Sequence, residues 1–393
     1  MKTLSISPLA GIDHTSIRDD ALLPHGDERR TYVRDALNVD ISVAGRASMR
    51  PGLRQATATT YSDLWQSPSH GLFGRLGGQW VKIDPANWGH AVLAEIGEAP
   101  LAHLQLNNRV VAAGRDGLFE SDGTTARRMA LDVPAPPIVT SGSGSLPEGA
   151  YGVAVAWLRG AQESPTSSIT HAHVPAAGSL EVILPLVTDP TVTGARMYLT
   201  RTNGGELLRG EDFPPGTSSV SLPVLPGLGA TAQFHGAGAM PTGKFLSYWR
   251  GRLLVAQGNV LRFSQALAYH VHDARHDFIQ LPQRVTFVAP LDGGIWVGQS
   301  DHVLFLAGNS PGELDISIKG GRRPVPGSAV ILSAENSGDT GGDQSVAWLA
   351  ENGYVTGTTN GAIIEHHAGR LSRISGDSGA SVMFAKRLLT SVL

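Results

Sequence analysis

The chain has 393 residues, more than the roughly 250–300 at which a single hydrophobic core stops growing, so we expect several domains or a ring of small repeated units. A net charge of −3 gives no electrostatic footprint for nucleic acid, and the lack of cysteine excludes disulfides and thiolate chemistry. No long apolar run is present, so we expect neither a signal peptide nor a membrane span.

The glycine and proline content indicates many tight turns between short strands. There are 48 glycines and 24 prolines, without a collagen-like period. A short β-rich run, a turn with Gly, Asn or Asp, and a second short β-rich run recur six times, over residues 36–49, 71–83, 106–121, 248–264, 292–306 and 350–364. Because one hairpin alone is marginally stable, the six must stack, which predicts an all-β, propeller-like ring of short antiparallel hairpins. A pair of ordinary β-sandwiches is the alternative.

Between residues 133 and 240, the repeated hairpin pattern is interrupted by a segment with a different sequence pattern. It opens with prolines and a Gly/Ser stretch, and its first strand places Tyr151, Val153, Val155 and Trp157 on one face at period two. We expect an inserted immunoglobulin-like or fibronectin-like β-sandwich. The predicted organisation is an N-terminal arm over 1–24, propeller-like parts over 25–132 and 241–393, and the sandwich over 133–240.

The N-terminal arm is expected to pack on a neighbouring element. Its apolar residues Leu4, Ile6, Leu9 and Ile12 are spaced to lie along a surface.

Two serine motifs invite an enzymatic interpretation. Gly376-Asp-Ser-Gly379 resembles the nucleophile loop of chymotrypsin-like proteases, but no His or Asp in a recognisable context accompanies Ser378. The Ser-x-Asp-x-Gly turns that begin at Ser337 and Ser375 echo sialidase-type propellers. Such an enzyme also needs an arginine cluster and a Tyr nucleophile, and Arg322-Arg323 is the only adjacent arginine pair near the later blades. We interpret these segments as Gly-rich turns.

Metal and nucleotide sites are also poorly supported by the sequence. The densest group of metal-ligand residue types is His270, His272, Asp273, His276 and Asp277, which we interpret as mainly solvated loop residues, with a structural metal as the alternative.

Two further motifs are weaker. His366-His367 points to opposite faces of a strand, and Gly227-Leu-Gly229 has no following helix. We therefore predict no catalytic, cofactor-binding or metal-binding residue, and no cofactor.

Three segments together resemble a known family. Asn38-Val-Asp-Ile-Ser-Val-Ala-Gly-Arg46 followed by Arg50-Pro-Gly52 resembles the N-terminal hairpin of bacteriophage tail hub and nozzle proteins. Pro147-Glu-Gly-Ala-Tyr151, Glu163-Ser-Pro165 and Gly194-Ala-Arg-Met-Tyr198 are similar to fibronectin-like modules of phage structural proteins. The runs that begin at Trp249, Asp292 and Val346 look like the propeller blades of the hub and nozzle proteins.

The resemblance implies a non-enzymatic structural protein of the virion. It would form part of a phage tail as a hub, nozzle or distal tube or tip, assembled in the host bacterial cytoplasm. Its implied partners are copies of itself in a symmetric ring, such as a hexamer, and other tail proteins such as an adaptor or fibre, with no sequence-specific nucleic acid. The alternatives are a receptor-binding tail module that recognises a cell-surface glycan and, less well supported, a glycan hydrolase on a propeller.

Overall fold

The computed structural model describes residues 8–23, 31–52, 54–337, 343–367, 369–384 and 386–393. They fall into two compact units. The first contains Met1–Thr60, Gly258–Val260 and Gln280–Leu393, and the second contains Tyr61–Gln257 and Leu261–Ile279. The predicted arm residues Leu4 and Ile6 lie outside the described residues.

The described residues are built from β-strands and turns. Their only helical turns are the short 3-10 segments Asp19–Leu22, Pro311–Glu313 and Ala334–Asn336. The prediction of an all-β chain of short strands with an inserted sandwich is confirmed.

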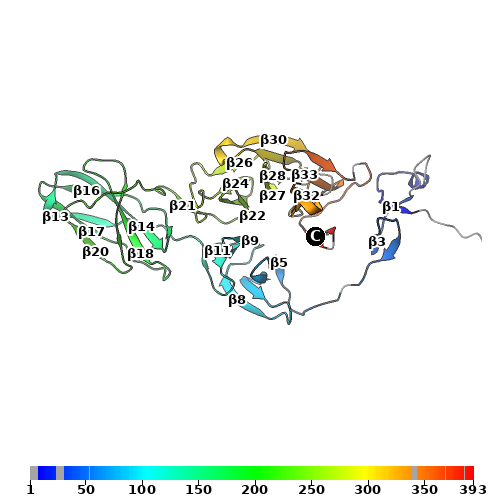
Figure 1. The fold of residues 1–393 in the computed structure, drawn as a ribbon, viewed down its shortest axis with the longest axis horizontal. Helices are drawn as coiled ribbons and strands as arrows, with labels where there is room; N and C mark the ends of the chain where they lie inside the picture. The colour runs from blue at the N-terminus through cyan, green and yellow to red at the C-terminus, as the bar shows by residue number, and fades with distance from the viewer. Residues whose placement is uncertain (1–7, 24–30, 53, 338–342, 368, 385) are drawn as a thin grey trace, which may run out of the picture. The chain divides into compact units, whose positions relative to one another are not determined.

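Five sheets of four strands each repeat along the described chain (Figure 1). We call them blades, because each is a meander of the kind found in β-propellers. Blade 1 is β5 (Ser62–Ser67), β6 (Gly71–Leu76), β7 (Gln79–Ile83) and β8 (His90–Glu95); blade 2 is β9 (Ala102–Leu106), β10 (Arg109–Gly114), β11 (Gly117–Ser121) and β12 (Ala126–Arg128). Blade 3 is β22 (Lys244–Trp249), β23 (Arg252–Gln257), β24 (Val260–Phe263) and β26 (Phe278–Gln280). Blade 4 is β27 (Val285–Leu291), β28 (Gly294–Gln299), β29 (Val303–Ala307) and β30 (Asp315–Gly320); blade 5 is β31 (Val330–Leu332), β32 (Ser345–Ala350), β33 (Gly353–Thr358) and β34 (Ile363–Glu365).

Five of the six predicted hairpins lie inside these blades. They form β6–β7, β10–β11, β23–β24, β28–β29 and β33–β34. The repeating unit is thus a four-stranded sheet, larger than the predicted hairpin, because flanking segments pair with the open edges of each hairpin. The sixth hairpin forms a separate two-stranded sheet of β3 (Val39–Ile41) and β4 (Ala47–Met49). Closure of the blades into a ring stays a prediction.

Positive backbone φ angles occur in tight turns between strands. The sequence predicted the turn at Gly258, but it placed Asn107 and Asn108 inside a strand run, where the structure has a turn. Asn107 and Asn108, between β9 and β10, have φ angles of 48° and 56°. Gly258, between β23 and β24, has a φ of 63°. Asn and Gly adopt this left-handed region at little steric cost, which is why they occupy these tight turns.

In the second unit, apolar side chains pack between successive blades. Phe73 and Trp80 of blade 1 lie in one buried cluster with Val110 and Phe119 of blade 2. A second cluster joins blade 2 to blade 3. His103 of β9 lies in the first interface, stacked on Trp65 with ring centroids 5.4 Å apart, and it accepts a 3.1 Å hydrogen bond from Trp80 Nε1. Burial lowers the pKa of His103 to about 4.

In the first unit, two tryptophans hold blades 4 and 5 together. Trp296 of β28 and Trp348 of β32 are buried with ring centroids 5.6 Å apart, and Phe287 packs on Trp348 at 5.4 Å. Trp249 is also buried, but it ends the first strand of blade 3, whereas Trp296 and Trp348 lie on second strands.

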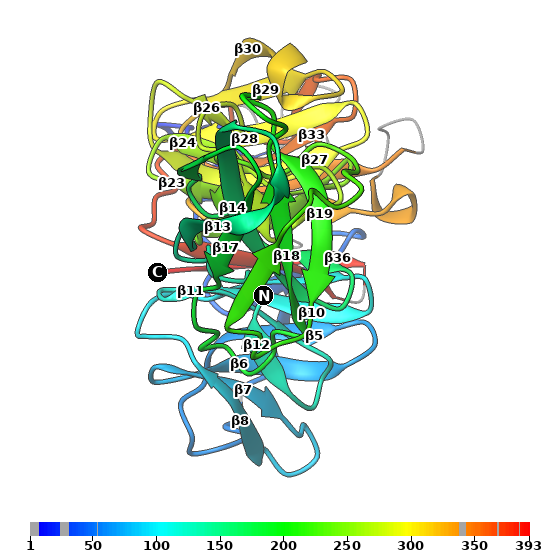
Figure 2. The same ribbon diagram turned by 90° about the vertical axis from the view of Figure 1, so that its left-hand side faces the viewer.

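The inserted segment forms two facing sheets (Figures 1 and 2). One contains β13 (Ile138–Leu146), β17 (Gly178–Ile183) and β20 (Ser219–Leu222); the other contains β14 (Gly149–Arg159), β15 (Gln162–Glu163), β16 (Thr170–Val174), β18 (Gly194–Leu199) and β19 (Leu208–Phe213). Tyr151, Val153, Val155 and Trp157 of β14 lie in the core between the sheets, as their alternation predicts. The predicted limits at residues 133 and 240 stay a prediction.

Four short sheets complete the described chain. β1 (Leu9–Ile12) pairs in parallel with β2 (Thr31–Val33), and β3 pairs with β4. β21 (Gly238–Ala239) pairs with β25 (Val271–His272), which lies between β24 and β26. β35 (Gly379–Phe384) and β36 (Arg387–Val392) form the hairpin that follows blade 5.

We predict that Trp296→Ala and Trp348→Ala each lower the free energy of unfolding by about 3–5 kcal/mol, because each leaves a large cavity between blades 4 and 5. Urea unfolding followed by circular dichroism measures the change. The exposed-site controls Ser378→Ala and Arg322→Ala should shift it by about 0.5 kcal/mol or less. A loss equal to that of the controls would contradict the interface.

We predict that acidification destabilises the second unit through His103. A buried His with a lowered pKa stabilises the fold above its unfolded pKa of about 6.5, and this stability is lost as the pH falls through the folded value of about 4. The full effect is about 3 kcal/mol. Urea unfolding between pH 7 and pH 4 should therefore show a smaller pH dependence for His103→Gln than for the wild type; equal slopes would contradict it.

Candidate functional site

A pocket of about 490 Å³ lies where the sandwich joins blades 2 and 3, within the second unit. Its walls come from β11 and β12, the turn between β14 and β15, the segment before β21 and the loop between β24 and β25. The lining residues are Glu120, Arg127, Met129, Ala161, Gln162, Glu163, Gln233, Phe234, Ala266, Leu267, Ala268, Tyr269 and His270. The mixture of charged and aromatic side chains in this lining makes the pocket a candidate functional site.

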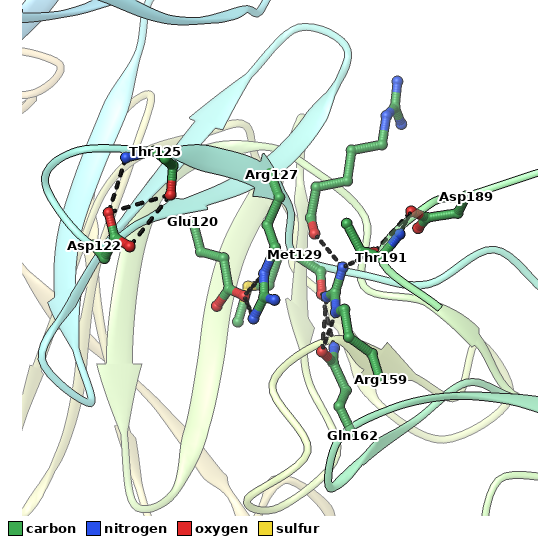
Figure 3. Close-up of polar contacts among 10 residues, drawn as sticks. Glu120, Asp122, Thr125, Arg127, Met129, Arg159, Gln162, Asp189 and Thr191 are labelled. Atoms are coloured by element: carbon green, nitrogen blue, oxygen red, sulfur yellow. Dashed lines mark hydrogen bonds and ion pairs between the residues drawn. The ribbon is translucent and has the colours of Figure 1, made fainter. Parts of the chain in front are cut away.

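The buried guanidinium of Arg159 ties the end of blade 2 to the sandwich beside this pocket (Figure 3). Its Nη2 donates to the carbonyl oxygen of Met129 at 2.6 Å, and its Nη1 donates to that of Arg128 at 3.1 Å. Gln162 Oε1 accepts from Nε at 2.9 Å and from Nη2 at 2.7 Å, while Gln162 Nε2 donates to Met129 O. Burial lowers the pKa of Arg159 from its ordinary value, but an arginine stays charged in a protein.

Local sequence explains how these partners meet. Arg159 is the last residue of β14, and the chain reverses at Gly160, whose φ is 60°. The reversal returns Gln162 to the same guanidinium. On the other side Thr191 accepts a hydrogen bond from Arg159, and Asp189 fixes Thr191 through its amide and hydroxyl at 2.8 and 2.7 Å.

An ion-pair network borders the pocket on the sandwich side. Glu163 binds Arg196 and the hydroxyl of Tyr198, both at 2.5 Å, and Asp212 holds Arg196 with two bonds of 2.7 Å. Burial, followed by the hydrogen bond to Glu163, raises the pKa of Tyr198. The hydrogen bond from Arg196 lowers the pKa of Asp212. The network joins β15, β18 and β19, so these charges hold the strands of the sheet together.

The blade side of the pocket is paired in a similar way. Arg127 binds Glu120 across β11 and β12 at 2.6 Å, and Asp122 caps the turn between these strands by accepting from the amides of Thr124 and Thr125 (Figure 3). His270 Nε2 donates to Glu163 O at 2.7 Å, which links the blade 3 loop to β15. Burial lowers the pKa of His270.

The predicted histidine–aspartate group does not come together as one site. His272 Nδ1 binds Phe263 O, Asp273 binds Arg275, and Asp277 accepts from the amide of Asp273. Across the described residues, no group of three or more His, Asp or Glu is placed to hold a metal ion. His270 and His272 also correct the expectation of solvated loop histidines, because both are hydrogen-bonded inside the protein.

The remaining sequence candidates lie in different segments of the first unit. Ser378 is exposed before β35, and Arg322 and Arg323 are exposed after β30. Ser337 is buried and donates to Ser333 O at 2.9 Å.

The adjacent histidines and the glycine motif likewise have structural contacts. His366 binds Thr356, whereas His367 packs on Tyr354. The amide of Gly229 donates to Arg209 O, and the chain continues through a loop into β21.

Sequence reasoning missed the contacts of Arg159. A charged residue that ends an apolar strand and is followed by Gly was the available signal, but its partners are the backbone carbonyls of Arg128 and Met129. A carbonyl acceptor carries no side-chain signature, so this pairing could not be read from the sequence.

Comparison with known proteins identifies no family. No family model and no curated protein matches the chain. Solved structures similar to it include the computationally designed Ika8 protein (11% identity, 86% of this chain and 95% of that chain covered, TM-score 0.28). Two others are Sqt1 of Saccharomyces cerevisiae (10%, 83% and 77%, 0.32) and BBS1N in complex with ARL6DN (14%, 74% and 90%, 0.25). At these values the similarities carry no argument about function.

We predict that Arg159→Ala lowers the free energy of unfolding by about 1–3 kcal/mol, because it leaves the buried Met129 carbonyl and Gln162 with fewer partners. Urea unfolding measures the loss, and limited proteolysis should show faster cleavage between residues 129 and 137.

The matched control is Arg209→Ala, which removes an exposed ion-pair partner of Asp212. It should lower the free energy of unfolding by about 1 kcal/mol or less. Equal stability and equal proteolysis of the two variants would contradict the role of Arg159.

Proposed function

We propose that this chain is a non-enzymatic structural protein that assembles with copies of itself, as a hub, nozzle or distal tube or tip component of a bacteriophage tail. The single observation that carries the assembly is the orientation of the β35–β36 hairpin. Its outward face carries exposed Val, Phe and Leu side chains, and its inward face is hydrogen-bonded to the rest of the unit.

The outward face of the hairpin carries exposed apolar side chains beside Arg387 and Ser391. Val382 and Leu389 are opposite each other across the two strands, with Phe384 two residues further along. Val382 is 57% exposed and Phe384 is 68% exposed. Aromatic and branched side chains at such exposure favour burial against another protein.

The inward face is anchored by polar contacts. Ser381 Oγ donates to Ser328 O at 2.5 Å, and the Tyr354 hydroxyl donates to Thr390 at 2.9 Å. The inward face also carries Met383 and Leu388, so the hairpin has apolar side chains on both faces, and its own chain covers only one of them. The uncovered apolar side chains therefore favour a partner protein over the outward face.

The β3–β4 hairpin supports the tail assignment. It contains most of the Asn38–Arg46 segment, and Arg50–Gly52, the other segment that resembles tail hub and nozzle proteins, follows it directly. Val43 and Met49 on it are almost fully exposed. Asp40 is held by Arg50 and Arg387 at 3.2 and 3.1 Å, and these bonds, the one to Arg50 first, lower its pKa. The motif thus supplies a fixed hairpin with apolar side chains available for contact.

The pocket between the sandwich and blades 2 and 3 favours a structural role over an enzymatic one. Glu120, Glu163 and His270 each make a hydrogen bond or ion pair within the protein. A catalyst needs an acid, base or nucleophile directed at a substrate, whereas these groups connect the sandwich to the blades or hold strands together. In the part of the chain that the structure describes, no helix is both long and apolar enough to cross a membrane.

The test is the oligomeric state of the purified protein. We expect mass photometry to show one discrete oligomer, and negative-stain electron microscopy to show a ring with an axial hole. The double variant Val382→Thr/Phe384→Ser should shift the population to smaller species, because it removes apolar side chains from the outward face.

The matched control is Ala380→Ser, on the same face of the same strand, and should assemble as the wild type does. A monomeric wild-type protein would overturn the proposed self-assembly. A trimeric spike that binds glycans would favour the receptor-binding alternative.

A further inference from the structure

The first four strands form a module that belongs to no blade. We define the N-terminal module as residues 8–23 and 31–50. Among the described residues, β1 pairs only with β2, and β3 pairs only with β4. Residues 51–61, described except for position 53, contain no strand or helix and connect the module to β5. The module is therefore held to the blades by a tether and by its side contacts.

The module contacts two points of the C-terminal part of its own unit. At the first point, the His14 amide donates to Arg370 O at 2.7 Å, and Thr15 Oγ1 donates to Gly369 O at 2.5 Å. Arg370 also pairs with Asp13 at 3.6 Å and stacks over the ring of Tyr32 at 3.8 Å. The Arg370 guanidinium therefore contacts a carboxylate and an aromatic ring of the module at the same time.

The second contact lies on the tip of the β35–β36 hairpin. Arg387 Nη1 donates to Asp40 Oδ2 at 3.1 Å, with Arg387 59% exposed. Both contacts are charge-complementary. The pair of Asp40 with Arg387 lies at the surface, whereas Asp13 of the first contact is buried. Both contacts can be broken without opening an apolar core and can be remade with the same groups of another copy.

The module also carries apolar side chains that these contacts leave exposed. Ile17 is 96% exposed, Leu37 is 83% exposed and Met49 is 87% exposed. Exposed groups of this size on one small module indicate that more of its surface is covered in the assembled protein.

The tether is long enough to reach a neighbour. Its eleven residues, 51–61, span up to about 36–40 Å when extended. An element on such a tether can dock on its own chain or on an adjacent copy with the same contacts, which is the arrangement that permits domain swapping.

We propose that, in the assembled protein, the N-terminal module of each copy docks on Arg370 and Arg387 of the neighbouring copy. The partner is a second copy of this chain, so the inference rests on the proposed self-assembly. The contact joins one surface to a different surface, is therefore heterologous, and closes into a ring if the rotation between copies allows.

The cysteine-free sequence provides a direct experiment. Ser48 is the cross-strand partner of Asp40, and Lys386 precedes Arg387, so cysteines at these exposed sites report the contact without removing its ion pair. Chains with Ser48→Cys and one affinity tag are co-expressed with chains carrying Lys386→Cys and a second tag. Particles that contain both tags are isolated and treated with a short bismaleimide.

We expect a cross-linked product of two chains that carries both tags. It should be several-fold more abundant than with Ser391→Cys in place of Lys386→Cys, because Ser391 lies at the other end of β36. The double variant Ser48→Cys/Lys386→Cys in one chain should give a ladder that ends at the ring size.

Two outcomes overturn the inference, and they can be distinguished. If both tags co-purify but the double variant cross-links only within single chains, the module docks in cis and the proposed assembly survives. If the tags do not co-purify and the wild type is monomeric, the proposed self-assembly fails together with the exchange.

Discussion

Two strands alone do not make a stable sheet in water, and much of this architecture follows from that constraint. A hairpin leaves one apolar face and two hydrogen-bonding edges exposed, so it needs further strands and a neighbouring sheet. The five blades satisfy this by adding strands to a central hairpin and by packing Trp80 or Trp296 against the next blade. The hairpins β3–β4 and β35–β36 have gained no further strands from the described chain, and their apolar side chains remain exposed. The same constraint that builds the blades therefore leaves these two hairpins in need of a partner.

Polar contacts fix the orientation of the sandwich, whereas apolar cores hold neighbouring blades together. Arg159 holds the sandwich to blade 2 through backbone carbonyls, and His270 holds it to blade 3 through the carbonyl of Glu163. Such bonds fix orientation because they have directions and defined lengths, whereas apolar packing is not directional. An inserted domain needs this orientation if it is to present a surface at a defined place on an assembly.

The sequence carried enough information to predict strands, turns and the core of the sandwich. Alternation at Tyr151, Val153, Val155 and Trp157 gave the buried face of β14 because the side-chain period of a strand is two. The turn at Gly258 was readable because positive φ restricts the residue type. Flanking strands such as β8 and β26 were not found, because short edge strands with mixed polarity give a weak pattern. The site was not readable either, since Arg159 is satisfied by carbonyl oxygens of Arg128 and Met129, which every residue possesses.

The distribution of contact types along the chain bears on how copies could join. Blade interfaces bury tryptophan and phenylalanine, so separating them would expose large apolar surfaces to water. The N-terminal module instead meets its docking points through hydrogen bonds and the ion pairs of Asp13 and Asp40. The exposed pair of Asp40 with Arg387 contributes little, whereas Asp13 is buried. Exchange of the module between copies replaces each bond by an identical one, so its free-energy change is small before any new surface is buried. Burial of Leu37, Val43 and Met49 against the neighbour would then add a favourable term that the isolated chain lacks. A joint of this kind stays reversible during folding and becomes stable once copies are close together.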